Sequence, residues 1–242
     1  MKPYILAHRG ASALAPENTR ASFQFAVDMG VDGVEFDVQM TRDNELVIIH
    51  DEKVDRTSDG QGYVKDFTLK EIKALDAGIW FSKKFKGEKI LTLNETLKIV
   101  KECEMINIEL KNGIIKYPYL EERVIHTVRS YHLEEKVIFS SFNHFSIHEI
   151  SKIAPDIMTG ILYISILYKP WDYAKQVGAK AIHPHYLGIT GEIIERSHEN
   201  GTKVNVYTVN EENDIIKMCK EGVDSIITDY PDRAIKLLKN LE

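Results

Sequence analysis

The sequence predicts an α/β fold of the (β/α)8 TIM barrel class, with a small insertion after the hairpin of the second strand. Its length of 242 residues is close to that of one such barrel. Short runs rich in Ile, Val and Tyr alternate with longer segments of helical periodicity, which is typical of β/α units around a parallel sheet. No linker rich in Pro, Gly or Ser divides the chain. We therefore expect residues 1–242 to form a single barrel domain.

Eight short apolar runs are predicted as the strands of this barrel. They are Tyr4–Ala7, Gly33–Val38, Met105–Leu110, Lys136–Ser140, Met158–Leu162, Ala179–His183, Lys203–Thr208 and Ser225–Thr228. Eight amphipathic segments between or after them are predicted as helices. These are Thr19–Met29, Leu93–Glu104, Tyr119–His132, Phe145–Ala154, Pro170–Gln176, Gly191–Glu199, Glu211–Glu221 and Pro231–Leu241. Eight strands and eight helices match a closed barrel.

Local signals support several of these boundaries. Thr92 is followed three residues later by Glu95, which is a capping box that satisfies free amides at a helix start. Glycine is the residue type that most readily ends a helix, because it adopts the left-handed conformation without steric cost. Glycines stand where four helices should end, at Gly30, Gly178, Gly201 and Gly222.

The second predicted strand continues into another apolar run without an intervening helix. Residues 33–40 pass through a polar turn into Glu45–His50, so an antiparallel hairpin is the simplest interpretation. If the turn is centred between residues 43 and 44, Asp37 lies opposite His50. In that register both side chains share one face of the sheet.

The segment Asp51–Lys89 follows the hairpin and breaks the alternation of strands and helices. It contains a glycine-rich loop and one short helix, which a capping box of Thr68 and Glu71 begins. We expect this segment to be a small insertion that rises from the rim of the barrel.

Composition excludes several classes of protein. Lys and Arg number 31 against 37 Asp and Glu, which gives a net charge of −6 and a pI near 5.9. This balance argues against a nucleic acid partner bound through a basic face. No apolar run is long enough for a membrane span or a secretory signal, so we expect a cytoplasmic protein without stable membrane association. The two cysteines, Cys103 and Cys219, are expected to be reduced.

Barrel enzymes place their catalytic side chains at the carboxyl ends of the strands. The charged or titratable side chains on the first three barrel strands are His8 and Arg9, then Glu35 and Asp37, then Glu109 and Lys111. The members of the last two pairs are two residues apart, so both side chains of each pair point to the same face. These six side chains are therefore candidates for one site.

Three carboxylates in one site would repel one another unless a cation neutralised them. Glu35, Asp37 and Glu109 therefore predict one divalent cation with a preference for oxygen ligands, Mg²⁺ or Ca²⁺. Without clustered cysteine ligands, a structural zinc site is not expected.

Two histidines, His8 and His50, flank this predicted metal site. Histidine is the side chain best suited to give or take a proton near neutral pH. Arg9 and Lys111 add fixed positive charge. A divalent metal, two acid–base groups and two cations favour attack on an anionic centre, and a phosphate ester is the commonest such substrate. We therefore predict phosphodiester hydrolysis.

Three aromatic side chains near later strand ends are further candidates for the substrate pocket. His183 and His185 flank a proline at the end of the sixth predicted strand and are candidates for contacting substrate. Tyr207, at the end of the seventh, is predicted to form part of the pocket wall and to contact substrate.

These residues, in this order, resemble the glycerophosphodiester phosphodiesterase family. The matching segments are His8–Arg9–Gly10, Pro16–Glu17–Asn18–Thr19, Gly33–Val38, Thr41–Arg42–Asp43, His50–Asp51, Asp55–Arg56–Thr57, Leu75–Asp76–Ala77–Gly78, Ile108–Lys111, Ser140–Ser141–Phe142, Val206–Asn210 and Thr228–Pro231. They span the whole chain. Two positions differ from the family pattern, since Leu91 stands where Pro is common and Tyr207 where Trp is common.

The resemblance implies a (β/α)8 barrel that hydrolyses glycerophosphodiesters, such as glycerophosphocholine or glycerophosphoethanolamine, to glycerol 3-phosphate and an alcohol. It implies acid–base roles for the positions of His8 and His50 and phosphate binding at Arg9 and Lys111. It also assigns the divalent metal to the three carboxylates. The implied partner is a small-molecule substrate.

Two other functions stay open at this point. The same chemistry could act on lysophospholipids or phosphoinositides if the rim were apolar, and the insertion contains the apolar run Ile79–Trp80–Phe81 beside several lysines. A barrel that only binds phosphorylated ligands is the non-enzymatic alternative. Such a protein would be free to lose His8, His50 or a metal ligand, and this chain retains all of them.

Overall fold

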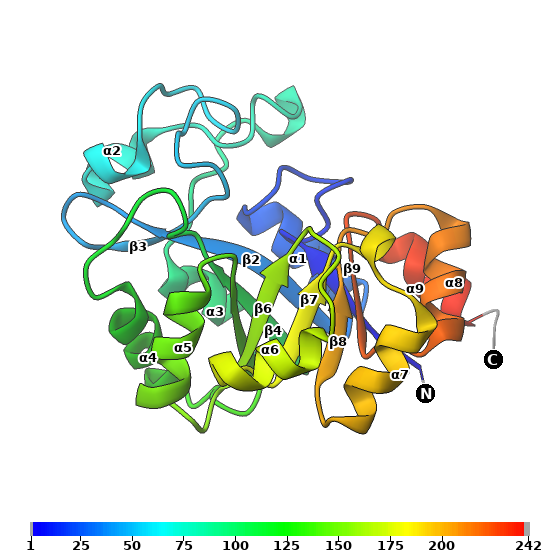
Figure 1. Cartoon of the computed structure of the whole chain (residues 1–242). Helices are drawn as coiled ribbons and strands as arrows, with labels where there is room; N and C mark the ends of the chain where they lie inside the picture. Colours follow the sequence, from blue (N-terminus) through cyan, green and yellow to red (C-terminus); the bar gives the residue numbers. More distant parts are fainter. Residues whose placement is uncertain (1, 240–242) are drawn as a thin grey trace.

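The computed structural model describes residues 2–239 and contains a barrel with its helices on the outside (Figure 1). The strands are β1 Tyr4–His8, β2 Gly33–Met40, β3 Leu46–Ile48, β4 Met105–Leu110, β5 Val137–Ser141, β6 Met158–Tyr163, β7 Ala181–Pro184, β8 Lys203–Val206 and β9 Ser225–Thr228. The α-helices are α1 Arg20–Asp28, α2 Leu69–Ala74, α3 Leu93–Val100, α4 Leu120–Ser130, α5 His144–Ile153, α6 Pro170–Val177, α7 Gly191–Glu199, α8 Glu212–Glu221 and α9 Pro231–Lys239. Short 3₁₀ helices cover Val64–Asp66, Lys83–Phe85 and Tyr186–Gly188.

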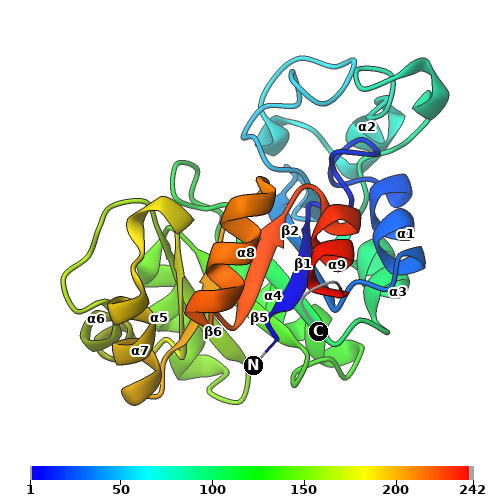
Figure 2. The same cartoon turned by 90° about the vertical axis from the view of Figure 1, so that its right-hand side faces the viewer.

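The sheet closes on itself through the first strand. Its order is β1-β9-β8-β7-β6-β5-β4-β2-β3, and β1 also pairs with β2. Every pairing is parallel except that of β3, which lies antiparallel on β2 outside the closed ring. In Figure 2 the N-terminal strand β1 lies between β2 and the last strand. The predicted (β/α)8 class is confirmed.

The strand β2 shows why this sequence folds as a buried barrel strand. All eight of its residues are buried. Val34, Phe36 and Val38 belong to the main apolar cluster outside the ring, where Phe36 packs edge-on against Phe23 of α1 at 5.6 Å between ring centroids. The alternate positions, which carry the acidic side chains, therefore face the barrel interior.

The predicted register of the β2–β3 hairpin is wrong by one residue. Val38 pairs with Ile48 and the amide of Ile49 donates to the carbonyl of Asp37, so Ile49 rather than His50 lies opposite Asp37. His50 still reaches the site because β3 ends at Ile48 and strict alternation ends with it. The amide nitrogen of buried Gln39 lies 2.6–3.0 Å from the carbonyl oxygens of residues 49–51 and fixes this turn.

Helix boundaries follow the predicted capping signals closely. Thr92 and Thr68 both form capping boxes, with Glu95 and Glu71 respectively. The glycines at 30, 178, 201 and 222 all have positive φ angles. The helix predicted over Leu93–Glu104 is shorter than expected, because α3 ends at Val100 and leaves Cys103 in the following loop. The predicted end of the last helix, Leu241, lies outside the described residues.

The segment between β3 and α3 stands above the end of the barrel at which the parallel strands finish (Figures 1 and 2). It has a small apolar cluster of its own, separate from the barrel clusters. The buried members of that cluster are Val47, Ile49, Val54, Val64, Ile72, Ala77 and Ile90. Because Val47 lies in β3 and Ile49 directly follows it, the hairpin connects this segment to the barrel.

Both cysteines are free thiols. Among the described residues, no helix is long and apolar enough to cross a membrane.

Gly160 in β6 is required by the packing of the barrel interior. A side chain at this position would collide with the imidazole of His183 on the neighbouring strand, and His183 is fully buried. We expect Gly160→Ala to lower the free energy of unfolding by about 1–3 kcal/mol, as overpacking of a core does. Urea unfolding measures this. Gly113→Ala is the matched control, because open space surrounds that position, and an equal loss in both variants would contradict the explanation.

Candidate active site

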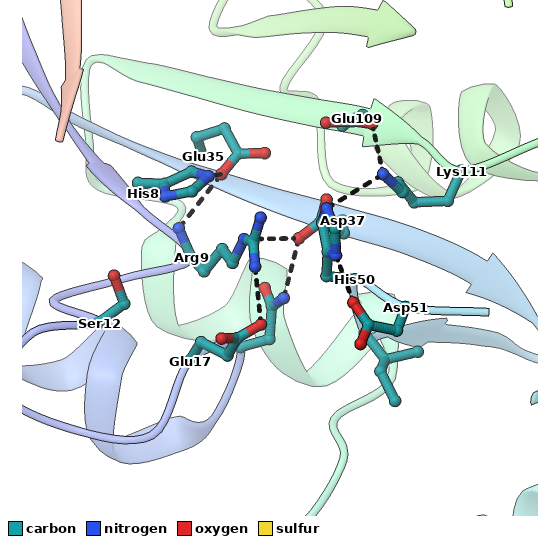
Figure 3. Close-up of polar contacts among 12 residues, drawn as sticks. His8, Arg9, Ser12, Glu17, Glu35, Asp37, His50, Asp51, Glu109 and Lys111 are labelled. Atoms are coloured by element: carbon teal, nitrogen blue, oxygen red, sulfur yellow. Dashed lines mark hydrogen bonds and ion pairs between the residues drawn. The ribbon is translucent and has the colours of Figure 1, made fainter. Parts of the chain in front are cut away.

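The site lies at the carboxyl end of the parallel strands, where the segment between β3 and α3 overhangs the barrel (Figures 1 and 3). His8 ends β1, while Glu35 and Asp37 lie on β2 and Glu109 on β4. Arg9, Lys111 and His50 follow β1, β4 and β3 respectively. The structure thus brings together all seven of these residues that the sequence predicted for one site.

Glu35, Asp37 and Glu109 form a compact, buried group. They are only 3%, 1% and 9% exposed, and one carboxylate oxygen from each lies within 4.8 Å of the others. Burial and repulsion from the neighbouring carboxylates raise the pKa of Glu35 well above its ordinary value. Burial also raises the pKa of Glu109, although Lys111 acts in the opposite direction. The positive charge near these carboxylates is therefore too small to neutralise all three of them.

A metal cation fits this group. Asp37 differs from its neighbours. Burial would raise its pKa, but the charges of Arg9, His50 and Lys111 and a hydrogen bond from Asn18 together outweigh burial and lower it to about 2. Asp37 is therefore an anion, and its Oδ1 is buried without a hydrogen-bond partner in the described part of the chain. A buried carboxylate oxygen without a partner is costly unless a ligand satisfies it. The three residues can thus hold a metal ion between them.

Arg9 is placed by a sharp turn after β1. Arg9 and Gly10 both have left-handed backbone angles, with φ of 56° and 79°. A side chain at Gly10 would collide with the backbone of Ser22 in α1, so this turn requires glycine there. The turn points the Arg9 guanidinium into the site, where Nε lies 3.4 Å from Asp37 Oδ2. Arg9 Nε is itself buried without a hydrogen-bond partner among the described residues.

Lys111 supplies the second cation from the opposite side of the site. Its Nζ lies 2.9 Å from Glu109 Oε1 and 3.2 Å from Nε2 of His50 (Figure 3). Burial tends to lower its pKa, but the adjacent Glu109 and Asp37 raise it above the ordinary value. Lys111 is therefore fully protonated at neutral pH.

Each catalytic candidate histidine is oriented by a carboxylate. His8 Nδ1 lies 2.6 Å from Asp229 Oδ1, and His50 Nδ1 lies 2.6 Å from Asp51 Oδ1. The other nitrogen of each ring faces the site: His8 Nε2 is 3.8 Å from Glu35 Oε2. A carboxylate on Nδ1 fixes the ring orientation and leaves Nε2 to exchange protons with a substrate.

The candidates on the later strands are not all part of this site. His183 is fully buried below it, hydrogen-bonded to Asn205 at 3.0 Å, and burial lowers its pKa to about 3. The expectation that His183 contacts substrate is therefore wrong, because its side chain fills the barrel interior. His185 packs against Tyr207 at the rim, with 6.0 Å between ring centroids. The Tyr207 hydroxyl donates to the carbonyl of Tyr163.

Four residues that orient the site were not assigned roles from the sequence. Asp229 and Asp51 orient the histidines, Asn18 donates to Asp37 Oδ2 at 2.9 Å, and Glu17 accepts from Arg9 at 2.9 Å. The position of Asp229 could have been inferred. It directly follows β9, which neighbours β1 in a closed barrel, and therefore lies beside the end of β1.

The fold and this site define a class of enzyme. The site contains two oriented histidines and two cations around a buried carboxylate group, at the carboxyl ends of the strands of a (β/α)8 barrel. This arrangement is typical of an enzyme that hydrolyses phosphate esters. Residues 8–233 match the Glycerophosphoryl diester phosphodiesterase family, and this range begins at His8 and includes every site residue described above. The chain belongs to that family.

Relatives agree over the full length of the chain. It is 48% identical to a glycerophosphodiester phosphodiesterase of Caldanaerobacter subterraneus subsp. tengcongensis over 240 residues, which cover 99% of each chain. A glycerophosphodiester phosphodiesterase of Bacillus altitudinis is 40% identical over 242 residues, or 98% of this chain and 99% of that one.

Solved structures agree as well. A phosphodiesterase from Oleispira antarctica, determined in complex with its product sn-glycerol-3-phosphate, superposes with a TM-score of 0.88 at 31% identity and covers 98% of this chain and 97% of that one. A glycerophosphodiester phosphodiesterase from Agrobacterium tumefaciens superposes with a TM-score of 0.85 at 30% identity, covering 97% and 99%. These matches make the chain a phosphodiesterase of this family.

Proposed function

We propose that this enzyme hydrolyses glycerophosphodiesters to glycerol 3-phosphate and an alcohol, with His8 and His50 as the general acid and base. The observation that carries the proposal is the arrangement of these two histidines. Each is held by a carboxylate at 2.6 Å through Nδ1, and each directs Nε2 into the same site, beside the buried carboxylates or Lys111. The product complex of the Oleispira antarctica relative supports glycerol 3-phosphate as the product.

The cations of the site would bind the phosphate. Arg9 Nε is buried with no hydrogen-bond partner within residues 2–239, and Lys111 Nζ faces the site beside His50. A phosphodiester has one negative charge and two free oxygens, which suit an arginine and a lysine on opposite sides. With the phosphate between them, the two imidazole rings would lie near the bond to be broken.

Proton transfer completes the reaction. One imidazole takes a proton from the nucleophile, which is water or the substrate's own glycerol hydroxyl, as that oxygen bonds to phosphorus. In the second case a cyclic phosphate forms, and water then opens it to glycerol 3-phosphate. The other imidazole gives a proton to the alkoxide as the bond between phosphorus and the alcohol oxygen breaks. Asp229 and Asp51 would stabilise whichever imidazole becomes positively charged.

Glu35, Asp37 and Glu109 would hold one divalent cation, Mg²⁺ or Ca²⁺. Their oxygen ligands, close spacing and deficit of positive charge suit a cation of this kind. Bound there, the cation would supply positive charge to a phosphate oxygen. The chain's own contribution is to keep the carboxylates together in a buried site, with Asn18 fixing one oxygen of Asp37.

Product identity tests the proposed reaction. Incubation with glycerophosphocholine in the presence of Mg²⁺ or Ca²⁺ should release glycerol 3-phosphate and choline, which enzymatic assays measure separately. Formation of glycerol and phosphocholine would contradict the proposal. Turnover of a long-chain lysophosphatidylcholine, measured in parallel, separates a small-molecule enzyme from one that acts on lipids.

The Asp229–His8 pair should contribute to stability in a pH-dependent manner. Burial opposes ionisation of Asp229, but hydrogen bonds from His8, Asn210 and Ser12 outweigh it and lower its pKa from 3.8 to about 2. Because the folded pKa lies below the unfolded one, this contribution is present above about pH 4 and is lost as the pH falls toward 2. In urea unfolding, the stability difference between the wild type and Asp229→Asn should therefore shrink below pH 4. A difference that stays constant from pH 7 to pH 3 would contradict this.

A further inference from the structure

Arg56, in the segment after β3, makes an unusual set of contacts beside the site. Its Nη1 and Nη2 atoms donate to the two carboxylate oxygens of Glu17, each at 2.8 Å. Its Nε and Nη2 atoms donate to the two oxygens of Asp51 at 2.8 and 3.0 Å. One guanidinium thus holds two carboxylates, each through two hydrogen bonds.

Both of these carboxylates contact a site residue. Glu17 Oε1, which accepts from Arg56, also accepts from Nη1 of Arg9 at 2.9 Å. Asp51 Oδ1, which also accepts from Arg56, lies 2.6 Å from Nδ1 of His50. The hydrogen bonds therefore run without interruption from Arg9 through Glu17, Arg56 and Asp51 to His50.

This series of hydrogen bonds joins three separate segments of the fold. Glu17 lies in the loop between β1 and α1, Asp51 directly after β3, and Arg56 in the segment that overhangs the site. Gln39 holds the backbone of Asp51 through its carbonyl oxygen, at 2.6 Å. The side chain of Asp51 is held instead by Arg56, which thereby connects it to Glu17 in the loop after β1.

The charges of the linked side chains favour this arrangement. Hydrogen bonds from Arg56 are the largest cause of the strongly lowered pKa of Asp51. Burial would raise the pKa of Glu17, but Arg56 and Arg9 together lower it below its ordinary value. Both carboxylates are therefore anions. Without Arg56, the ion pairs left among the described residues would be that of Glu17 with Arg9 and that of the Asp51 carboxylate with His50.

We propose that Arg56 is a positioning residue that couples the placement of His50 to that of Arg9, through Asp51 and Glu17. The inference rests on the proposed function, in which His50 transfers a proton and Arg9 binds phosphate. Loss of Arg56 frees Asp51 to turn the imidazole away, which lowers kcat. It also leaves Glu17 free to draw Arg9 from the phosphate position, which raises KM.

Steady-state kinetics of Arg56→Ala on glycerophosphocholine tests this. We expect kcat to fall about 100-fold, the loss that an ångström-scale displacement of a catalytic group can cause, and KM to rise several-fold. Arg56→Lys should recover little, because one ammonium group cannot donate to both carboxylates bidentately. Guanidinium ion at millimolar concentration should restore part of kcat in Arg56→Ala and have no such effect on Arg56→Lys.

Arg42→Ala is the matched control. Arg42 is also an arginine that pairs with a carboxylate, Glu71, and donates to the carbonyl of Asp66, so it too connects the hairpin to the overhanging segment. It makes no hydrogen bond or ion pair to a site residue in the described part of the chain. We expect its kinetics to stay within about twofold of the wild type, the effect of losing an exposed ion pair.

The outcomes separate the inference from the function on which it rests. A wild type that releases no glycerol 3-phosphate contradicts the proposed function. An active wild type with Arg56→Ala unchanged in kcat and KM, or with Arg42→Ala and Arg56→Lys equally impaired, contradicts the positioning role. If Arg56→Ala does not fold, Glu17→Gln and Asp51→Asn replace it. The activity lost in the double variant should be less than the two single losses combined, because each substitution breaks the same series of hydrogen bonds.

Discussion

Replacing His50 with alanine is expected to lower kcat/KM by about 10²–10⁴-fold, the usual contribution of a positioned acid or base. His8→Ala should show a loss of the same order. Both imidazoles are held through Nδ1 and face the site through Nε2, so neither can substitute for the other without moving its carboxylate partner. Steady-state kinetics with glycerophosphocholine measures the loss, and circular dichroism verifies that the barrel is folded.

His198→Ala is the matched control for these variants. His198 Nε2 pairs with Asp224 at 2.8 Å, so it is also a histidine held by a carboxylate, but it lies on α7, away from the site. Its replacement should leave kcat/KM unchanged. An activity in His8→Ala or His50→Ala equal to that of His198→Ala would remove that histidine from the mechanism.

Glu35→Gln should have the second large effect, because it removes a carboxylate from the proposed metal site. Loss of a ligand should weaken Mg²⁺ or Ca²⁺ binding by more than the roughly 10–100-fold that loss of an outer-shell partner costs. Because a bound metal contributes several kcal/mol to the reaction, kcat/KM should fall by at least about 10³-fold. Isothermal titration with the metal ion and kinetics test the two expectations separately.

The stability of Glu35→Gln should not fall with its activity. Burial and neighbouring carboxylates already disfavour the charged form of Glu35, so a neutral glutamine should not destabilise the metal-free protein. Added Mg²⁺ or Ca²⁺ should raise the thermal unfolding temperature of the wild type but not that of Glu35→Gln. Asp32→Asn is the control. Asp32 precedes the same strand and accepts from the amide of Ile5 at the other end of the barrel, so the metal should stabilise it as it does the wild type.

The fold could be predicted from the sequence because its signals are local and repeated. Apolar runs such as those of β2 and β4 mark barrel strands, and Thr92 with Glu95 marks a helix start in the pattern that the structure shows. The hairpin register differs from the prediction because the turn is centred on Asp43 rather than between residues 43 and 44. The amide of Thr41 donates to the carbonyl of Glu45, and Asn44 takes a left-handed conformation with φ of 64° that adds a residue to the turn.

The site could be predicted where spacing along one strand decides it. Glu35 and Asp37 share a face because they are two residues apart, and Glu109 lies beside Asp37 because β4 pairs with β2. The carboxylate behind His8 is different, since Asp229 is 221 residues away in the sequence. The place of His183 could not be predicted for a related reason. The sequence shows that it ends a strand, but only the packing against Gly160 shows that it lies below the site.

Release of glycerol 3-phosphate with and without metal tests the central proposal most directly. Protein treated with a chelator and then dialysed should release no glycerol 3-phosphate from glycerophosphocholine. Addition of Mg²⁺ or Ca²⁺ should restore the release in the wild type and fail to do so in Glu35→Gln. Release at the full rate in the presence of chelator, by protein verified to be free of metal, would contradict the proposed role of the three carboxylates.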